Sequence, residues 1–118
     1  MEELWFVIDE TALRRKIAPT DVMHEQYEHL LTVCASPYVQ IQVLLLAVGP
    51  HAGLAGPVSL LDVPGQGTVV YAEGAAGGHL LSRSEDVHEQ ERRYDLSRAD
   101  ALSHADSTRL IRTILENL

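Results

Sequence analysis

Residues 38–48 constrain the fold most strongly, because apolar side chains there alternate with glutamines and then give way to a continuous apolar run. Gln40 and Gln42 interrupt the apolar positions at every second residue, which is the period of a β-strand with one buried and one solvated face. From Leu44 to Val48 every residue is apolar, so we expect the strand to continue there into the core. The chain therefore builds at least one sheet, which its other elements have to cover.

Four further segments have the length and the β-branched or aromatic content of strands. Residues 4–8 are a continuous apolar run, and Asp9 after them is expected to cap a short helical turn. Residues 58–63 and 68–73 flank a Pro-Gly-Gln-Gly turn, which predicts a β-hairpin. Residues 79–82 predict a short edge strand after a glycine-rich stretch.

Two amphipathic helices are predicted from apolar residues that recur on one helical face. We expect Thr20 or Asp21 to cap the first, and Ser103 or Asp106 to cap the last. The last helix is expected to pack on the sheet or against a second subunit. A helix that begins near Ser84 is only weakly amphipathic. The two apolar stripes consist of Met23, Tyr27, Leu30, Leu31 and Cys34, and of Leu110, Ile111, Ile114, Leu115 and Leu118.

The predicted elements follow the order β-α-β-β-β-α-α, with strands in the middle of the chain and helices around them. This order is typical of an α+β fold. We therefore predict a largely antiparallel sheet of four to five strands with flanking helices. The length of 118 residues is close to the usual size of one domain, so residues 1–118 are expected to form a single α+β domain.

Charge, cysteine content and the lengths of the apolar runs indicate which partners and which compartment to expect. The net charge of −8 argues against a nucleic-acid reader, because such proteins present a basic patch to the phosphates. Cys34 is the only cysteine, so no intrachain disulfide can form, which fits a reducing cytosol. Glu2 and Glu3 stand where a signal peptide would be basic, and the longest apolar run, residues 43–48, is far too short for a membrane span. We expect a cytoplasmic protein that makes no membrane contact.

The first amphipathic helix looks superficially like that of a zinc protease, but its histidines have a different spacing. That site needs two histidines at positions i and i+4, whereas here Glu28 lies four residues after His24, and His29 follows it. His24 and Glu28 are expected to form a polar pair on a solvated face. Cys34 lies on an apolar stripe, and residues 74–78 lack the Lys-Ser/Thr of a phosphate-binding loop. The sequence therefore predicts no catalytic set and no cofactor.

Several stretches match one protein family in the same order. They are residues 4–15, residues 39–44 running into the Gly/Pro loop at 49–57, residues 69–73 with the glycines after them, and residues 101–111. The chain resembles the domain of unknown function that follows the helix-turn-helix in many actinobacterial XRE-type regulators. That group is also described as Scr-type antitoxin-like transcriptional regulators. The resemblance covers nearly the whole chain.

The resemblance implies the regulatory or partner-binding half of a transcription factor, often encoded beside a small protein. It supplies no catalytic residues. The helix-turn-helix and the helical segment before the first strand are missing from this sequence, which leads us to expect a trimmed piece or a natural short relative. DNA would then be reached only through a helix-turn-helix that this chain lacks. Leu45-Leu46 stands where the family usually has Pro-Phe, and Val58 stands where Phe is common.

The resemblance also indicates which residues form the rim of a binding site. In the hairpin, the resemblance implies that Tyr71 and Glu73 belong to this rim. Glycine and proline in the preceding loop have a mainly structural role in fixing the backbone, although loops on a rigid scaffold are where binding residues concentrate. The loop residues that match the family are His51, Gly53, Leu54, Gly56 and Pro57.

Three functions therefore compete. The first is a regulatory module that binds a small protein or forms a homo-oligomer through the last helix and an edge strand. The second is a sensor that holds a small molecule between the Gly/Pro loop and the helical layer. The third is a metal-assisted hydrolase that would use His24, Glu28 and His51. The absence of a catalytic motif favours the first two, and we predict a binding protein rather than an enzyme.

Overall fold

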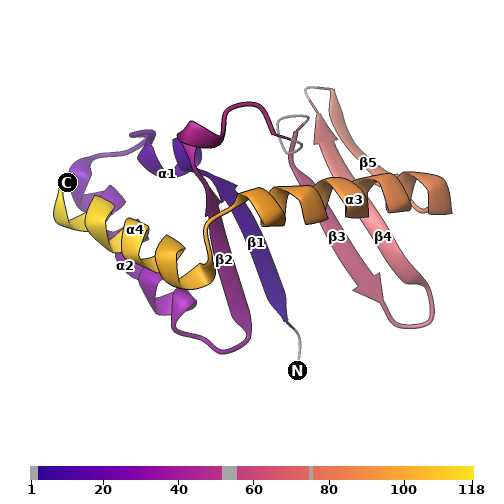
Figure 1. The fold of residues 1–118 in the computed structure, drawn as a ribbon, viewed down its shortest axis with the longest axis horizontal. Helices are drawn as coiled ribbons and strands as arrows, with labels where there is room; N and C mark the ends of the chain where they lie inside the picture. Colours follow the sequence, from indigo (N-terminus) through magenta and orange to yellow (C-terminus); the bar gives the residue numbers. More distant parts are fainter. Residues whose placement is uncertain (1–2, 52–55, 75) are drawn as a thin grey trace. The chain divides into compact units, whose positions relative to one another are not determined.

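The computed structural model describes residues 3–51, 56–74 and 76–118 (Figure 1). The chain divides into two compact units. Residues 1–49 with residues 100–118 make up the first unit, and residues 50–99 make up the second. That the whole chain forms a single domain stays a prediction.

The first unit contains a two-stranded parallel sheet. Strand β1 (Leu4–Asp9) pairs with β2 (Val39–Leu44) so that Leu4 lies opposite Val39 and Asp9 opposite Leu44. The segment between them holds α1 (Glu10–Arg14) and α2 (Thr20–Cys34). A crossover through a helix returns the chain in the same direction, which makes the pairing parallel.

The predicted single, largely antiparallel sheet of four to five strands is therefore wrong. The structure instead has this parallel pair and a separate three-stranded antiparallel sheet in the second unit. The mixture of helices and strands itself is confirmed. The error arose because a count of strands along the sequence does not show which strands exchange hydrogen bonds.

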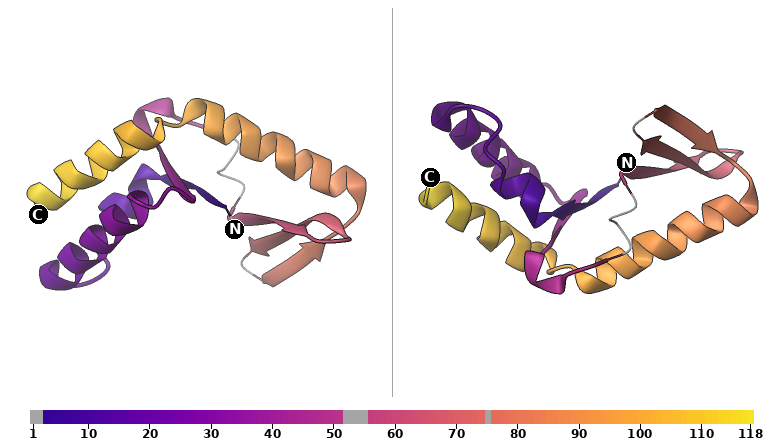
Figure 2. Two further views of the ribbon diagram at one scale, coloured as in Figure 1. Left: turned by 90° about the horizontal axis from the view of Figure 1, so that it is seen from below. Right: turned by 90° about the horizontal axis from the view of Figure 1, so that it is seen from above.

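One face of the parallel sheet forms the core of the first unit with α2 and α4 (His104–Glu116). Figure 2 shows these two helices side by side, and their side chains contact each other. The predicted apolar stripe of α2 is confirmed, and so is that of α4 except at Leu118, which follows the helix and is exposed. The last helix uses its stripe within the unit. The buried core consists of Leu13, Met23, Tyr27, Cys34, Val39, Ile41, Val43, Ile111 and Ile114.

Two of the predicted helix caps are confirmed and one is wrong. The Asp9 carboxylate accepts a hydrogen bond from the Thr11 N–H (2.9 Å), and the Ser103 hydroxyl accepts one from the Asp106 N–H (3.1 Å). Helix α2 has Pro19 at its N-cap and no side-chain cap, although Thr20 or Asp21 was expected there. Thr20 is already the first helical residue, because the backbone of Pro19 accepts the first intrahelical hydrogen bond.

Strand β2 ends earlier than its apolar sequence predicts. The strand stops at Leu44, and a 3₁₀ turn (Leu46–Val48) follows it. The carboxylate of Glu10 accepts a hydrogen bond from the Leu46 N–H (2.8 Å), which fixes the backbone away from an extended course. Continuation of the strand to Val48 is therefore wrong, because a distant carboxylate competes with strand pairing for this backbone group.

The second unit contains the predicted hairpin and edge strand. Strands β3 (Val58–Val63), β4 (Gly67–Gly74) and β5 (Gly77–Leu81) form an antiparallel sheet in that order. Helix α3 (Ser84–Asp100) follows β5. Among the described residues of this unit, Val70 of β4 and Val87 of α3 are the buried apolar ones.

Candidate functional site

The predicted Gly/Pro loop meets the end of β4 through its backbone. The Glu73 N–H donates a hydrogen bond to the Pro57 carbonyl (3.2 Å). Gly56 has a φ of +127°, and a Cβ atom at this position would lie 3.3 Å from the Glu73 carbonyl oxygen. The structure thus brings Gly56, Pro57 and Glu73 together, but as a backbone junction. Gly53 and Leu54 lie outside the described residues.

The Tyr71 ring packs on a glycine of the neighbouring strand. A Cβ atom built at Gly78 of β5 would overlap this ring. An aromatic side chain that covers a glycine across a strand pair stabilises that pair. The Glu73 side chain is exposed and His51 is half-buried. Gly56, Pro57, Tyr71 and the backbone of Glu73 therefore have structural contacts in the second unit, whereas a ligand-binding role for the predicted rim stays a prediction.

Replacing Gly56 by alanine is expected to lower the free energy of unfolding of the second unit by about 1–2 kcal/mol, since its positive φ disfavours a side chain. Gly74→Ala is the matched control, because a Cβ at Gly74 meets only the Gly77 carbonyl oxygen, at 3.9 Å. Thermal melts followed by circular dichroism compare the two variants. Equal melting temperatures for both would refute the strain at Gly56.

The residues of the hydrolase alternative do not form a metal site. His24 Nδ1 lies 3.3 Å from a Glu28 carboxylate oxygen, and both side chains are about half exposed on α2. This arrangement confirms the expected polar pair on a solvated face. Cys34 is a buried free thiol. Within residues 3–51, 56–74 and 76–118, no three His, Cys, Asp or Glu side chains are placed to hold one metal ion.

Side chains at the start of α4 seal the outer edge of β2. The Ile41 N–H donates to Nδ1 of His104 (2.9 Å), and the Val43 N–H donates to the hydroxyl of Ser107 (2.9 Å). The Leu102 N–H completes the edge by donating to the Val43 carbonyl (2.9 Å). Edge strands expose backbone groups that attract other strands. Here Leu102, His104 and Ser107 occupy the backbone groups that Ile41 and Val43 would otherwise present.

The ring of His104 is held from both sides. Its Nε2 lies 2.9 Å from the Cys34 carbonyl, at the end of α2. An Nε2–H tautomer satisfies this contact and leaves Nδ1 to accept from Ile41. The side chain therefore connects the end of α2, the middle of β2 and the start of α4 within the first unit.

The opposite edge of the same sheet, formed by β1, has large exposed apolar side chains. Leu4 is 51% exposed and Phe6 is 43% exposed, although both lie on the face that α2 and α4 cover at β2. Trp5, on the other face, is also exposed, and its indole N–H donates to the Gln42 side chain (2.7 Å). In the described part of the chain, the two-stranded sheet ends at β1.

The backbone of β1 determines which groups point to its outer edge. The Leu4 N–H donates to the Tyr38 carbonyl (2.9 Å), so the even-numbered residues of β1 direct their polar groups toward β2. Successive residues of a strand point these groups to opposite edges. Val7 therefore directs its N–H and C=O to the outer edge.

Glu10 is a buried carboxylate at the junction of β1 and α1. Hydrogen bonds from the Leu46 backbone and from the Arg14 guanidinium lower the pKa of Glu10 below its ordinary value of 4.5, against the opposing effect of burial. The Arg14 Nε lies 2.6 Å from its carboxylate. Glu10 therefore stays ionised in the folded unit at neutral pH and organises α1 with the turn after β2.

Sequence reasoning missed both the sealed edge of β2 and the exposed apolar side chains of β1. The sealing residues carry a weak signal, since His104 and Ser107 are polar residues spaced three apart at the start of an apolar stripe. Exposure of β1 has no such signal. A continuous apolar run predicts burial, and only the three-dimensional structure shows how far the covering helices reach.

The fold and its exposed strand define a mixed helix-and-strand protein with two small sheets. A family model described as "Domain of unknown function (DUF5753)" matches residues 2–113. The chain belongs to this family. Comparison with curated proteins gave no match, and comparison with solved structures gave none either. Among the described helices, none is both long and apolar enough to cross a bilayer.

Proposed function

We propose that this chain is a regulatory partner-binding module, and that the outer edge of β1 accepts an extended segment of a small partner protein. Addition of a strand to an exposed sheet edge is a common mode of peptide recognition, in which backbone hydrogen bonds supply affinity and side-chain pockets supply specificity. The exposed apolar side chains of Leu4 and Phe6 are the observation that carries this proposal.

The two edges of the parallel sheet differ in a way that favours β1. The β2 edge is occupied by backbone and side-chain groups of residues 102–107. At β1, the outward groups of Val7 are accompanied by apolar side chains on both faces of the strand. Natural edge strands are usually protected by charges or proline, and residues 4–8 contain neither.

Charge indicates the chemistry of the partner. Glu3 is exposed next to the apolar part of β1, and the chain as a whole has a net charge of −8. Complementary charge steers association and fixes register. We therefore expect the partner segment to be apolar at its centre and to carry lysine or arginine at its flanks.

The resemblance to XRE-type regulators supports a biological setting for this module. In this proposal the module is the partner-binding half of an XRE-type, antitoxin-like regulator, it works in the cytoplasm, and its partner is the small protein encoded beside it. DNA binding belongs to a helix-turn-helix on another segment or chain. No catalytic role is assigned, and the metal-assisted hydrolase is set aside because its three residues form no ligand set among the described residues.

Titration of the purified chain with the small neighbouring protein tests the proposal. Trp5 is the only tryptophan, so a blue shift of its fluorescence reports that β1 becomes covered. Val7→Pro is expected to weaken binding at least tenfold, because proline removes one outward donor and is tolerated where the N–H faces away from the sheet. Phe6→Ser is expected to weaken binding severalfold without altering the backbone.

Leu80→Ser is the matched control, since Leu80 is an exposed apolar residue on the edge strand of the other sheet. It is expected to bind like the unaltered chain. Thermal melts establish that each variant folds. The proposal fails if the small protein does not bind, or if folded Val7→Pro and Phe6→Ser both bind normally.

A further inference from the structure

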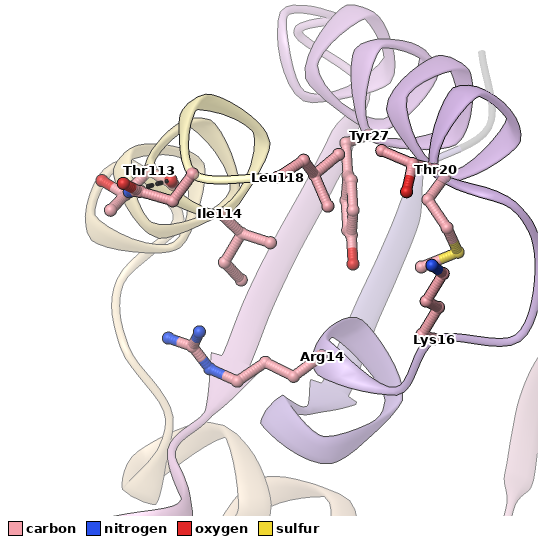
Figure 3. Close-up of a pocket in the computed structure, with 9 residues that line it drawn as sticks. Arg14, Lys16, Thr20, Tyr27, Thr113, Ile114 and Leu118 are labelled. Atoms are coloured by element: carbon pink, nitrogen blue, oxygen red, sulfur yellow. Dashed lines mark hydrogen bonds between the residues drawn. The ribbon is translucent and has the colours of Figure 1, made fainter.

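A cavity of about 200 Å³ opens within the first unit, among α1, α2 and α4 (Figure 3). Its floor is apolar, because Met23, Tyr27 and Ile114 are buried core residues that also line it. Its rim is polar and carries two cationic side chains, Arg14 and Lys16. A mainly apolar cavity with a few convergent polar groups is the usual form of a small-molecule site.

The wall of this cavity is fixed. The Tyr27 hydroxyl donates to the Leu13 carbonyl, so its polar end is satisfied within the unit. In Figure 3 the Tyr27 ring stands between Ile114 on one side and Lys16 on the other. The hydroxyl-bearing side chains of Thr20 and Thr113 also line the cavity. A rigid wall lowers the entropy lost when a ligand binds.

The rim has positive charge in a strongly acidic chain. Glu10 binds Nε of Arg14 (2.6 Å), which positions the guanidinium at the cavity. Lys16 is exposed, and in the described residues no carboxylate lies within ion-pair distance of its amine. Because Glu10 compensates the charge of Arg14, Lys16 supplies the net positive charge of the rim. In a chain with a net charge of −8, it is a local reversal of sign that attracts an anion.

We propose that the cavity binds a small organic anion, with its carboxylate at Lys16 and its apolar body on Met23 and Tyr27. Size supports this class of ligand, since an apolar cavity of about 150 Å³ holds one benzene molecule. A ring with one carboxylate therefore fits about 200 Å³. Inorganic phosphate would match the charges but would leave the apolar floor uncovered. This site is separate from the β1 edge and does not depend on the proposed function.

Methyl NMR of the full chain gives a direct test with benzoate as the probe. The sequence has two methionines, so ¹³C-methyl labelling gives a Met23 signal on the cavity floor and a Met1 signal for reference. Benzoate is expected to shift the Met23 signal saturably, whereas neutral benzamide and inorganic phosphate shift it little. Lys16→Gln is expected to weaken benzoate binding at least about tenfold through loss of a charge-assisted hydrogen bond.

Arg15→Gln is the matched control, because Arg15 lies between the two rim cations in sequence but does not line the cavity. It is expected to change benzoate affinity less than about twofold. An unchanged Met23 signal before ligand addition establishes that each variant keeps the cavity. The proposal is overturned by the absence of a saturable shift, by an equal response to benzamide or phosphate, or by equal effects of Lys16→Gln and Arg15→Gln.

Discussion

Ser107→Ala is expected to lower the free energy of unfolding of the first unit by about 1–3 kcal/mol, which is the cost of a buried polar group left without a partner. The Ser107 hydroxyl is completely buried and accepts the Val43 N–H. Alanine removes this acceptor and supplies no other. Because the position is completely buried, water cannot easily reach the Val43 N–H in its place. Urea unfolding followed by Trp5 fluorescence measures the effect, because Trp5 belongs to this unit.

Thr108→Ala is the control for this experiment. The Thr108 hydroxyl donates to the His104 carbonyl within the helix (2.9 Å), where the carbonyl already has a helical partner. Its removal is expected to change stability by less than about 0.5 kcal/mol. A Ser107→Ala loss no larger than the Thr108→Ala loss would contradict the account of a sealed β2 edge.

Glu10→Gln is expected to lower the free energy of unfolding by about 1–2 kcal/mol at pH 7, because hydrogen bonds to a charged group are stronger than neutral ones. Glutamine still offers an oxygen to the Leu46 N–H but loses the ion pair with Arg14. Urea unfolding across a pH series measures the effect. Glu28→Gln, at an exposed i,i+4 pair on α2, is the control and is expected to have little effect.

The pH dependence of this loss has a definite sign. Folding lowers the pKa of Glu10 below its ordinary value of 4.5, so the ionised carboxylate adds stability above that pH. This contribution disappears as pH falls from 4.5 through the lower pKa of the folded state. The difference between Glu10→Gln and the unaltered chain should therefore shrink in acid. A difference that is the same at pH 7 and pH 3 would contradict the role of ionised Glu10.

Features that depend on nearby residues could be predicted from the sequence. The apolar stripes of α2 and α4 follow from helical spacing, and the Asp9 and Ser103 caps follow from side chains that reach the next turn. The β3–β4 hairpin follows from its short turn. In each case the determining contacts span only a few residues.

Features that depend on distant residues could not be predicted in this way. The parallel pairing of β1 with β2 depends on how the chain crosses over through α2, and β2 ends where the carboxylate of Glu10 takes the Leu46 N–H. The site shows the same limit. The motif indicates Gly56 and Tyr71 as binding residues, but their contacts with the Glu73 carbonyl and with Gly78 show structural roles.

Amide hydrogen exchange of β1 tests the central claim most directly. In the free chain, the Val7 amide is expected to exchange rapidly, while the Phe6 and Ile8 amides, which face β2, exchange slowly. Binding of the small partner protein is then expected to slow Val7 at least about a hundredfold, as a new strand pairs with the edge. A Val7 amide already as protected as Ile8 in the free chain, or unchanged in the complex, would contradict the account.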